Sequence, residues 1–384
     1  MTDDNTTTDI DADDATDTES RLRRRTLMGL GLASPAFGGL GLAALQSRLA
    51  GASDGTAADP FRLSGSTTAT DATARQARTR VTDPVDGQTE VAEDYGVVSA
   101  STSLLRSLGA DVGRQLRIRR TDDEYAVYTV VEAHEGSEPL VRMNGTAKSR
   151  LALAEGDWVG EPDCRLGCPR PEETPAIADE TFDAEAESVV PAADLTAEEA
   201  READELVEDA TEGGTEFLVL APHGGDVEPR TAEQAEHVRD RVDDATTWLT
   251  KGFRAGGGAF VRWHVPSFAI HPASYPALAD VAGRRYERAV SFHGICSDCI
   301  QVGGAAPKSV RARVRDAINA ALPESASPAI LADGAYRAEG EHVLVNQLTA
   351  GDEGGVWVGQ PVADRERYWR AIADAVVDAV RGEN

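Results

Sequence analysis

The amino-acid sequence predicts an α/β fold, in which a mixed sheet is flanked by helices and preceded by a small β-barrel domain. Two observations carry this prediction. Residues 94–162 contain apolar and polar residues in alternation, the period of half-buried strands. From Thr215 onward, short apolar runs alternate with longer helical patterns, which is the order of a sheet covered by helices on both faces.

Residues 1–52 have the pattern of an export signal. The run Arg24-Arg25-Thr26-Leu27-Met28 resembles the twin-arginine motif, and a weakly apolar, Gly- and Ala-rich stretch follows it. This stretch is too short and too rich in glycine for a membrane span, and Ala50-Gly51-Ala52 fits the small-residue rule for cleavage. We therefore predict a secreted, extracellular protein that meets the twin-arginine translocase during export and keeps no stable membrane anchor. The alternative, a basic N-terminal arm on a cytoplasmic protein, leaves the apolar run unexplained.

The composition is typical of a halophilic protein, and we predict a haloarchaeal origin. Acidic residues number 66 against 38 basic ones, and only three of the basic residues, Lys148, Lys251 and Lys308, are lysine. Molar salt shortens the Debye length to about 3 Å, so the self-repulsion of such a surface is screened. An acidic mesophilic protein is the alternative. Because no clustered Lys/Arg face is visible, the sequence disfavours a nucleic-acid partner.

The remaining chain divides into four predicted parts. Residues 53–93 have no hydrophobic period, which indicates a disordered linker. Residues 94–162 contain the strand patterns of the small barrel, and 141–159 resemble one half of a double-psi β-barrel, like the N-terminal barrels of AAA-type unfoldases. That resemblance implies an accessory or binding module. Residues 163–212 form an acidic connector, and 213–384 form the α/β domain.

Local patterns predict the elements of the last two parts. Thr196 and Glu199 form a capping box that opens a helix in the connector. In the α/β domain the patterns predict helices near 232–249, 274–285 and 307–321, and strands at 217–221, 260–264, 288–292, 343–345 and 356–358.

The strand at 217–221 leads directly into His223-Gly224-Gly225. Sites in open α/β sheets lie at the carboxyl ends of strands, and Glu228 follows closely enough to fold back toward the imidazole. His293 ends a second strand and is expected at the same edge. Two imidazoles and one carboxylate are the ligand set of a catalytic zinc that hydrolyses amides. Each histidine taken alone is as well explained as a satisfied polar group. The pattern Thr231-x-x-Gln234 predicts a cap for the helix that follows.

Residues 217–361 resemble the poly-γ-glutamate hydrolase family, zinc enzymes related in fold to the carboxypeptidases. Five blocks carry the resemblance: His223-Gly-Gly-x-x-Glu228-Pro-x-Thr231, His264-x-x-Ser267, His293-Gly294, Gly303-Gly304 and Asn346. The resemblance implies that His223, Glu228 and His293 bind zinc. It also implies that His264 and Asn346 face the substrate, an acidic polyamide or peptide cleaved at γ-glutamyl bonds.

The last block departs from the family pattern. The family has a Gly-Val-Gln-Leu-Glu-like strand, whereas this chain has Gly355-Val-Trp-Val-Gly359, so Gly359 replaces the expected general base. Glu353 is a candidate replacement. The alternatives are a metal-binding pseudoenzyme or surface binding protein, and a carboxypeptidase-like enzyme acting on ordinary peptides or N-acyl amino acids. Arg230 and Arg262 lie beside the motifs and are candidates for pairing with substrate carboxylates, although both also fit as plain surface arginines.

The four cysteines form two close pairs, Cys164-x-x-x-Cys168 and Cys296-x-x-Cys299. An extracellular destination favours disulfides, either within each pair or between the connector and the α/β domain. A structural Cys₄ zinc site and free thiols are the alternatives.

Overall fold

The computed structural model describes residues 75–152, 158–159, 170–171, 176–255, 258–350 and 354–382. The predicted export signal lies outside these ranges and stays a prediction, as does the part of the linker before residue 75. Among the described residues, no helix is long and apolar enough to cross a membrane.

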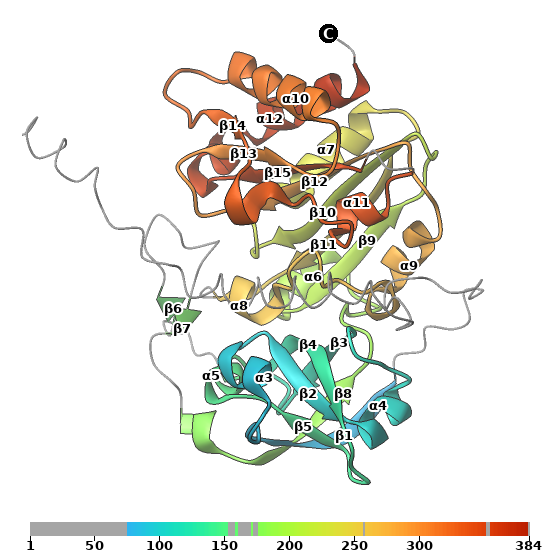
Figure 1. Cartoon of the computed structure of the whole chain (residues 1–384), viewed down its shortest axis with the longest axis vertical. Coiled ribbons are helices and arrows are strands. Elements are labelled where there is room, and N and C mark those ends of the chain that lie inside the picture. The colour runs from blue at the N-terminus through green and yellow to red at the C-terminus, as the bar shows by residue number, and fades with distance from the viewer. Residues whose placement is uncertain are drawn as a thin grey trace, which may run out of the picture. The chain divides into compact units, whose positions relative to one another are not determined.

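The first half of the described chain forms a closed six-stranded barrel (Figure 1). Its strands are, in spatial order, β1 (Gln76–Thr82), β5 (Leu140–Arg142), β2 (Val97–Ser101), β4 (Tyr125–His134), β3 (Gln115–Arg119) and β8 (Phe182–Glu187). Strand β1 pairs with β5, and β2 with β4, in parallel, whereas the other pairs are antiparallel. Closure leaves no unpaired edge in this sheet. Three short helices accompany the strands: α3 (Thr89–Glu93), α4 (Thr102–Leu108) and α5 (Gly145–Ser149).

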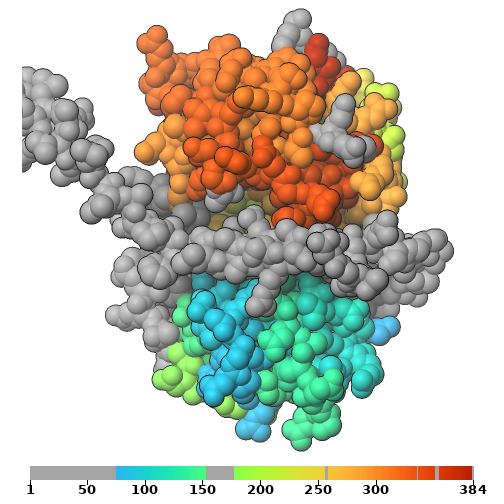
Figure 2. Space-filling view, in the orientation of Figure 1, coloured from blue at the N-terminus to red at the C-terminus, as the bar shows by residue number. Residues whose placement is uncertain are grey.

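The barrel extends beyond the predicted residues 94–162 at both ends. Strand β1 lies in the predicted linker and β8 in the predicted connector, and the two pair with each other along their length. Accordingly, yellow-green residues near 180 lie beside blue residues of the barrel in the space-filling view (Figure 2). Each strand buries only two side chains, Thr79 and Val81 in β1 and Ala184 and Ala186 in β8. Three of these four are small or polar, so the alternation along each strand is too weakly apolar to stand out in the sequence.

The second half contains a seven-stranded mixed sheet, which confirms the predicted fold class. Its spatial order is β14 (Ala329–Leu331), β13 (Ile300–Gly303), β15 (Val356–Gln360), β12 (Arg288–Gly294), β10 (Phe217–Gly225), β11 (Thr246–Gly252) and β9 (Leu206–Thr211). The four central strands β15, β12, β10 and β11 are parallel, whereas β13 and β9 run antiparallel to their neighbours β15 and β11. Outside both sheets, the described residues include the strand pair β6 (Trp158–Val159) and β7 (Arg170–Pro171).

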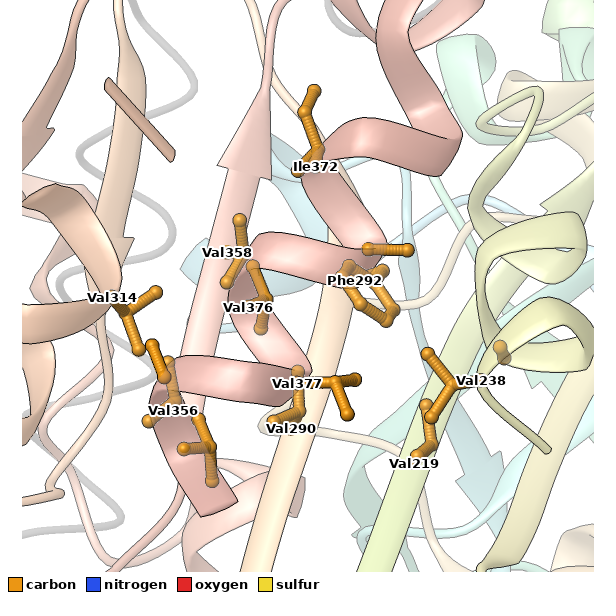
Figure 3. Close-up of a cluster of buried hydrophobic side chains, with 14 of the residues drawn as sticks. Val219, Val238, Val290, Phe292, Val314, Val356, Val358, Ile372, Val376 and Val377 are labelled. Atoms are coloured by element: carbon orange, nitrogen blue, oxygen red, sulfur yellow. The ribbon is translucent and has the colours of Figure 1, made fainter. Parts of the chain in front are cut away.

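Helices cover both faces of the seven-stranded sheet. On one face lie α7 (Thr231–Arg241), α10 (Lys308–Ala321) and α12 (Val362–Arg381), whose apolar side chains pack on β10, β12 and β15 (Figure 3). Leu249 of β11 belongs to this core, while the adjacent Trp248 contacts Tyr275 beside α9 (Pro276–Ala282). Because successive side chains of a strand point to opposite faces, α9 lies on the other face. The remaining described helices are α6 (Ala197–Glu202), α8 (Ala259–Trp263), α11 (Leu344–Gln347), η2 (Ala176–Asp179), η3 (Pro272–Ser274) and η4 (Gly334–Arg337).

Three predicted elements differ from the structure. The helix expected over 232–249 ends at Arg241, and the β-branched run from Thr246 forms β11 after a turn in which Asp244 has φ 63°. The strand expected at 260–264 is the helix α8, and the one expected at 343–345 is largely α11. Both are helices of at most five residues, too short to show a helical period in the sequence.

Of the two predicted helix caps, one is confirmed. Thr196 and Glu199 form the complete capping box of α6. The cap predicted from Thr231 is wrong, because Arg230 occupies the N-cap position and the Thr231 hydroxyl donates to the carbonyl of Glu228.

Candidate metal centre

Three adjacent parallel strands bring the predicted site residues to one edge of the sheet. His223 lies near the end of β10, His293 near the end of β12, and Gly359 on β15 pairs directly with His293. Both histidine side chains are buried. The structure therefore places the two histidines at the same edge, as their strand-end positions predict.

Glu228 returns to this edge through a tight turn. Gly225 has φ 71°, and the amide of Glu228 donates to the carbonyl of His223 at 2.7 Å. As a result, Glu228 Oε1 lies 3.3 Å from His223 Nδ1, and Oε2 lies 3.8 Å from His293 Nδ1. The amide of Gly294 also donates to Oε2 at 2.8 Å. The carboxylate thus lies between the two imidazoles, the arrangement that the sequence predicts.

His264, predicted to face the substrate, also joins this group. Donor atoms of His223, Glu228 and His264 all lie within 4.8 Å of one another. The ring centroids of His223 and His264 are 4.4 Å apart, and the His264 ring stacks on Phe260. Four side chains could therefore supply metal ligands, and His264 lies close enough to His223 and Glu228 to share one ion with them.

The hydrogen bonds of His223 indicate a cation site. Its Nε2 lies 2.7 Å from the carbonyl of Val265, and a carbonyl can only accept, so Nε2 carries the proton in the neutral ring. Nδ1 then holds a lone pair that faces the Glu228 carboxylate, and it has no hydrogen-bond partner in the described part of the chain. Two buried lone-pair donors in this arrangement repel each other unless a cation lies between them. The donor set therefore fits a metal ion.

The electrostatics favour the protonation states that a metal requires. Burial would raise the pKa of Glu228, but attraction to the neighbouring imidazoles of His223, His293 and His264 in their protonated forms outweighs burial and lowers it to about 2. Burial lowers the pKa of His293 to about 3 and brings that of His264 well below its ordinary value. At neutral pH the carboxylate is then charged and both of these imidazoles are neutral, as metal ligands must be.

Arg365 is a buried support of the site that nothing in the sequence indicates. Its Nε donates to the carbonyl of Pro229 at 2.5 Å and its Nη1 to that of Gln360 at 3.1 Å, which joins the Glu228 turn to the end of β15. A Cβ atom at Gly294 would collide with this guanidinium. The glycine beside His293 is therefore needed for packing against Arg365. The sequence alone does not indicate this contact, because Arg365 lies on α12, far along the chain from Gly294.

An aromatic side chain occupies the place expected for a general base. The indole of Trp357 stacks on His293, with centroids 5.1 Å apart, and it also stacks on Tyr336, with centroids 6.2 Å apart. A Cβ atom at Gly359 would overlap the indole ring and lie 2.9 Å from a methyl group of Ile295. A side chain at 359 is therefore excluded while Trp357 keeps this position. Glu353, the predicted replacement base, lies outside the described residues.

The predicted substrate-binding role of Asn346 is not supported by its contacts. Its amide nitrogen donates to the carbonyls of Ala338 and Gly340, and its oxygen accepts from the amides of Ala305 and Gly355. These bonds use both donors and both acceptor positions of the amide. Asn346 ties backbone segments together and has no bond to spare for a ligand.

The two candidate arginines also have other partners. Arg262 is buried, donates to the carbonyl of Asp123 and stacks on Tyr125 of the barrel, so its guanidinium is engaged away from the metal ligands. Arg230 is exposed and pairs with Glu233 at 3.1 Å. Arg230 therefore fits the alternative of a surface arginine. Arg262 is neither a surface arginine nor free to pair with a substrate carboxylate.

The cysteines of the α/β domain differ in state. Cys296 is disulfide-bonded and Cys299 is a free thiol, so the two are not bonded to each other. This excludes a Cys₄ zinc site. Cys164 and Cys168 lie outside the described residues.

Comparisons with known proteins match the part of the chain that carries the site. Residues 192–352 match the model of the family described as poly-gamma-glutamate hydrolase. The solved structure of a bacteriophage poly-gamma-glutamate hydrolase is similar at 20% identity, over 46% of this chain and 89% of that one, with a TM-score of 0.39. A zinc-free structure described as YNDL is similar at 18% identity, over 48% of this chain and 96% of that one, with a TM-score of 0.37. A metallo-carboxypeptidase from Burkholderia cenocepacia is similar at 10% identity, over 70% of this chain and 80% of that one, with a TM-score of 0.31. No curated protein matches the chain.

Proposed function

We propose that this chain is a zinc-dependent amidohydrolase that cleaves γ-glutamyl bonds of poly-γ-glutamate or a similar acidic polyamide. The family match over residues 192–352 supports the reaction and the substrate class. The observation that carries the metal is Nδ1 of His223, which has no hydrogen-bond partner in the described part of the chain and faces the Glu228 carboxylate at 3.3 Å in a buried site.

The ion would be held by His223 and Glu228 together with His293, His264 or both. When bound in such a set, zinc supplies a Lewis acid that polarises an amide carbonyl. The surrounding residues orient the ligands: the Val265 carbonyl fixes the ring of His223, and the hydroxyl of Ser291 lies 2.6 Å from Nε2 of His293. Such partners of a ligating histidine set its tautomer and its ring orientation.

A second function, metal binding without hydrolysis, is favoured by one observation. Trp357 covers Gly359, where the resemblance implies a glutamate as general base. Loss of a general base commonly lowers the rate by about 10²–10⁴-fold. A chain with this pair of residues would keep the metal and lose most of the turnover unless another carboxylate acts as base.

The test is to measure zinc content and hydrolysis of poly-γ-glutamate in molar salt for the full chain and for His223→Ala. We expect one zinc per chain with turnover, and both lost in the variant, because Nδ1 of His223 is a candidate ligand atom that has no hydrogen-bond partner among the described residues. His237→Ala is the matched control: His237 lies on α7, pairs with Asp374 at 2.9 Å and should leave zinc and turnover unchanged.

The outcomes separate the candidates. Zinc without turnover in the unaltered chain would favour the non-hydrolytic function, and a chain without zinc would overturn the site. Comparing γ-linked with α-linked glutamate oligomers distinguishes the proposed substrate from ordinary peptides.

A further inference from the structure

The segment Ala259–Ser274 links the barrel to the metal centre. It contains α8, a loop and η3, and is called here the His264 segment. It supplies two groups to the centre: the imidazole of His264, and the carbonyl of Val265 that accepts from His223 Nε2 at 2.7 Å. Contacts that hold this segment in place therefore position His264 directly and orient His223 through the carbonyl of Val265.

Arg150 of the barrel binds the segment immediately before His264. Its Nε donates to the carbonyl of Val261 at 2.6 Å, and its Nη2 lies 3.4 Å from that of Arg262. Both carbonyls lie in the last turn of α8, where the helix itself provides no amide partner. A guanidinium satisfies such carbonyls and interacts favourably with the negative end of the helix.

Barrel residues hold Arg150 itself in place. Nη1 donates to the carbonyl of Tyr95 at 3.0 Å, and the guanidinium lies 4.6 Å from the ring centroid of Tyr128. Arg150 is 1% exposed. Buried, charge-assisted hydrogen bonds of this kind are strong and directional, so the position of the barrel is transmitted to the end of α8.

The far end of the segment is also bound to the barrel. Gln115 donates to the carbonyl of Ala269 at 2.5 Å and accepts from the amide of His271 at 2.7 Å. Arg114 donates to the carbonyl of Ala273 at 2.7 Å. The loop that carries His264 and Val265 is thus held from both sides by barrel side chains.

We propose that the barrel is a structural part of the metal centre and that Arg150 is its positioning residue, acting through His264 and Val265. This inference rests on the proposed metal site. It gives the barrel a role other than that of an independent accessory or binding module. The family match begins at residue 192, so Arg150 lies outside it.

The test is Arg150→Met in the full chain. Methionine keeps apolar contact with Tyr128 and removes the donors. Zinc affinity is measured by competition with a chelator, and ligand geometry by the visible absorption of the cobalt-loaded protein. We expect affinity to fall by about tenfold or more, the range for partners that orient metal ligands, together with a changed cobalt spectrum.

Lys148→Met is the matched control. Lys148 lies two residues earlier, is fully buried, and bonds to Asp83 at 2.6 Å and to the carbonyl of Glu180 at 2.7 Å, within the barrel. It should lower the thermal midpoint as Arg150→Met does, yet keep the zinc affinity and cobalt spectrum of the unaltered chain.

Each outcome has one meaning. If Arg150→Met keeps the original affinity and spectrum, or if Lys148→Met changes them equally, the positioning role is overturned. If the unaltered chain binds neither zinc nor cobalt, the proposed metal site itself fails. Should Arg150→Met not fold, Gln115→Leu tests the other end of the segment, with a smaller loss of affinity expected and an unchanged affinity overturning the proposal.

Discussion

Trp357 and Gly359 act as one structural unit beside the metal centre. They lie two positions apart on β15, so they share a face of the strand, and the indole of Trp357 covers the glycine while stacking on His293. A large side chain at 357 requires a very small one at 359. The two positions therefore depend on each other, and both need to be altered to place a carboxylate at residue 359.

We expect Gly359→Glu alone to destabilise the protein and add no activity. The new side chain overlaps the indole, and overpacking of this kind typically costs about 1–3 kcal/mol of the free energy of unfolding. Adding Trp357→Gln frees the space, so the double variant should recover stability and gain hydrolysis of poly-γ-glutamate. Denaturant unfolding and a hydrolysis assay measure the two effects.

The single variant Trp357→Gln is the control for that comparison, because it opens the space without adding a carboxylate. A Gly359→Glu protein as stable as the unaltered chain would show that the indole moves aside and that the two positions are independent.

At the residue scale, the sequence could indicate the candidate ligands but not the residues that hold them in place. His223, Glu228 and His293 stand in short motifs at strand ends, where local pattern and sheet geometry suffice to place them. Arg150 and Arg365 act across long stretches of chain, and in an arginine-rich sequence neither stands out. Their roles follow from burial and from the carbonyls they bind.

At the element scale, the sequence predicts long helices and strands with a clear apolar pattern better than it predicts short ones. The apolar run that opens β10 and the amphipathic helix α10 show clear patterns and match the strand predicted at 217–221 and the helix predicted near 307–321. The long helix α12 is not among the predicted elements. The short helix α8 is predicted as a strand, because Phe260, Val261 and Trp263 form a short apolar run that Arg262 interrupts. Its helical form depends on partners elsewhere, including Arg150 and the carbonyl of Phe253, which accepts from the indole of Trp263.

Glu208 of β9 connects two elements and predicts a pH dependence of stability. Its carboxylate accepts from the indole of Trp248 at 2.6 Å and from the amides of Ala277 and Leu278 at the start of α9. Burial raises the pKa of Glu208 to about 7, although these hydrogen bonds oppose the shift. A carboxyl group in an unfolded chain has a pKa of about 4.3. Between these values the folded state binds more protons, so this contribution falls as pH rises from about 4.3 to 7.

We therefore expect the free energy of unfolding of Glu208→Gln to fall less between pH 5 and pH 8 than that of the unaltered chain, because the variant lacks the contribution of Glu208. The free energy of unfolding is measured at pH 5 and pH 8 for both proteins, and the unaltered chain should lose more stability over this interval than the variant. The other carboxyl groups are common to both proteins and cancel in the difference. Parallel profiles would show that Glu208 does not titrate in this range.

At the scale of the whole molecule, the barrel and the seven-stranded sheet meet through polar side chains that bind backbone groups. Arg114, Gln115 and Arg150 all reach from the barrel to the His264 segment. The sequence could not reveal this interface, since such bonds need no hydrophobic pattern. Buried bonds of this kind are screened by salt much less than exposed charges are.

The net charge of −28 predicts that the stability of the protein depends on salt. Repulsion among the acidic residues opposes the compact state, and the Debye length falls from about 10 Å at 0.1 M salt to about 3 Å at 1 M. We expect the thermal midpoint to rise steeply over this interval in KCl and to level off above it, since the interactions are then screened. Sucrose is the control, because an excluded neutral solute strengthens burial without screening charge. A midpoint that rises equally in sucrose at low ionic strength, or that ignores KCl below 1 M, would contradict charge repulsion as the main force opposing folding, and the acidic surface would then need an explanation other than adaptation to salt.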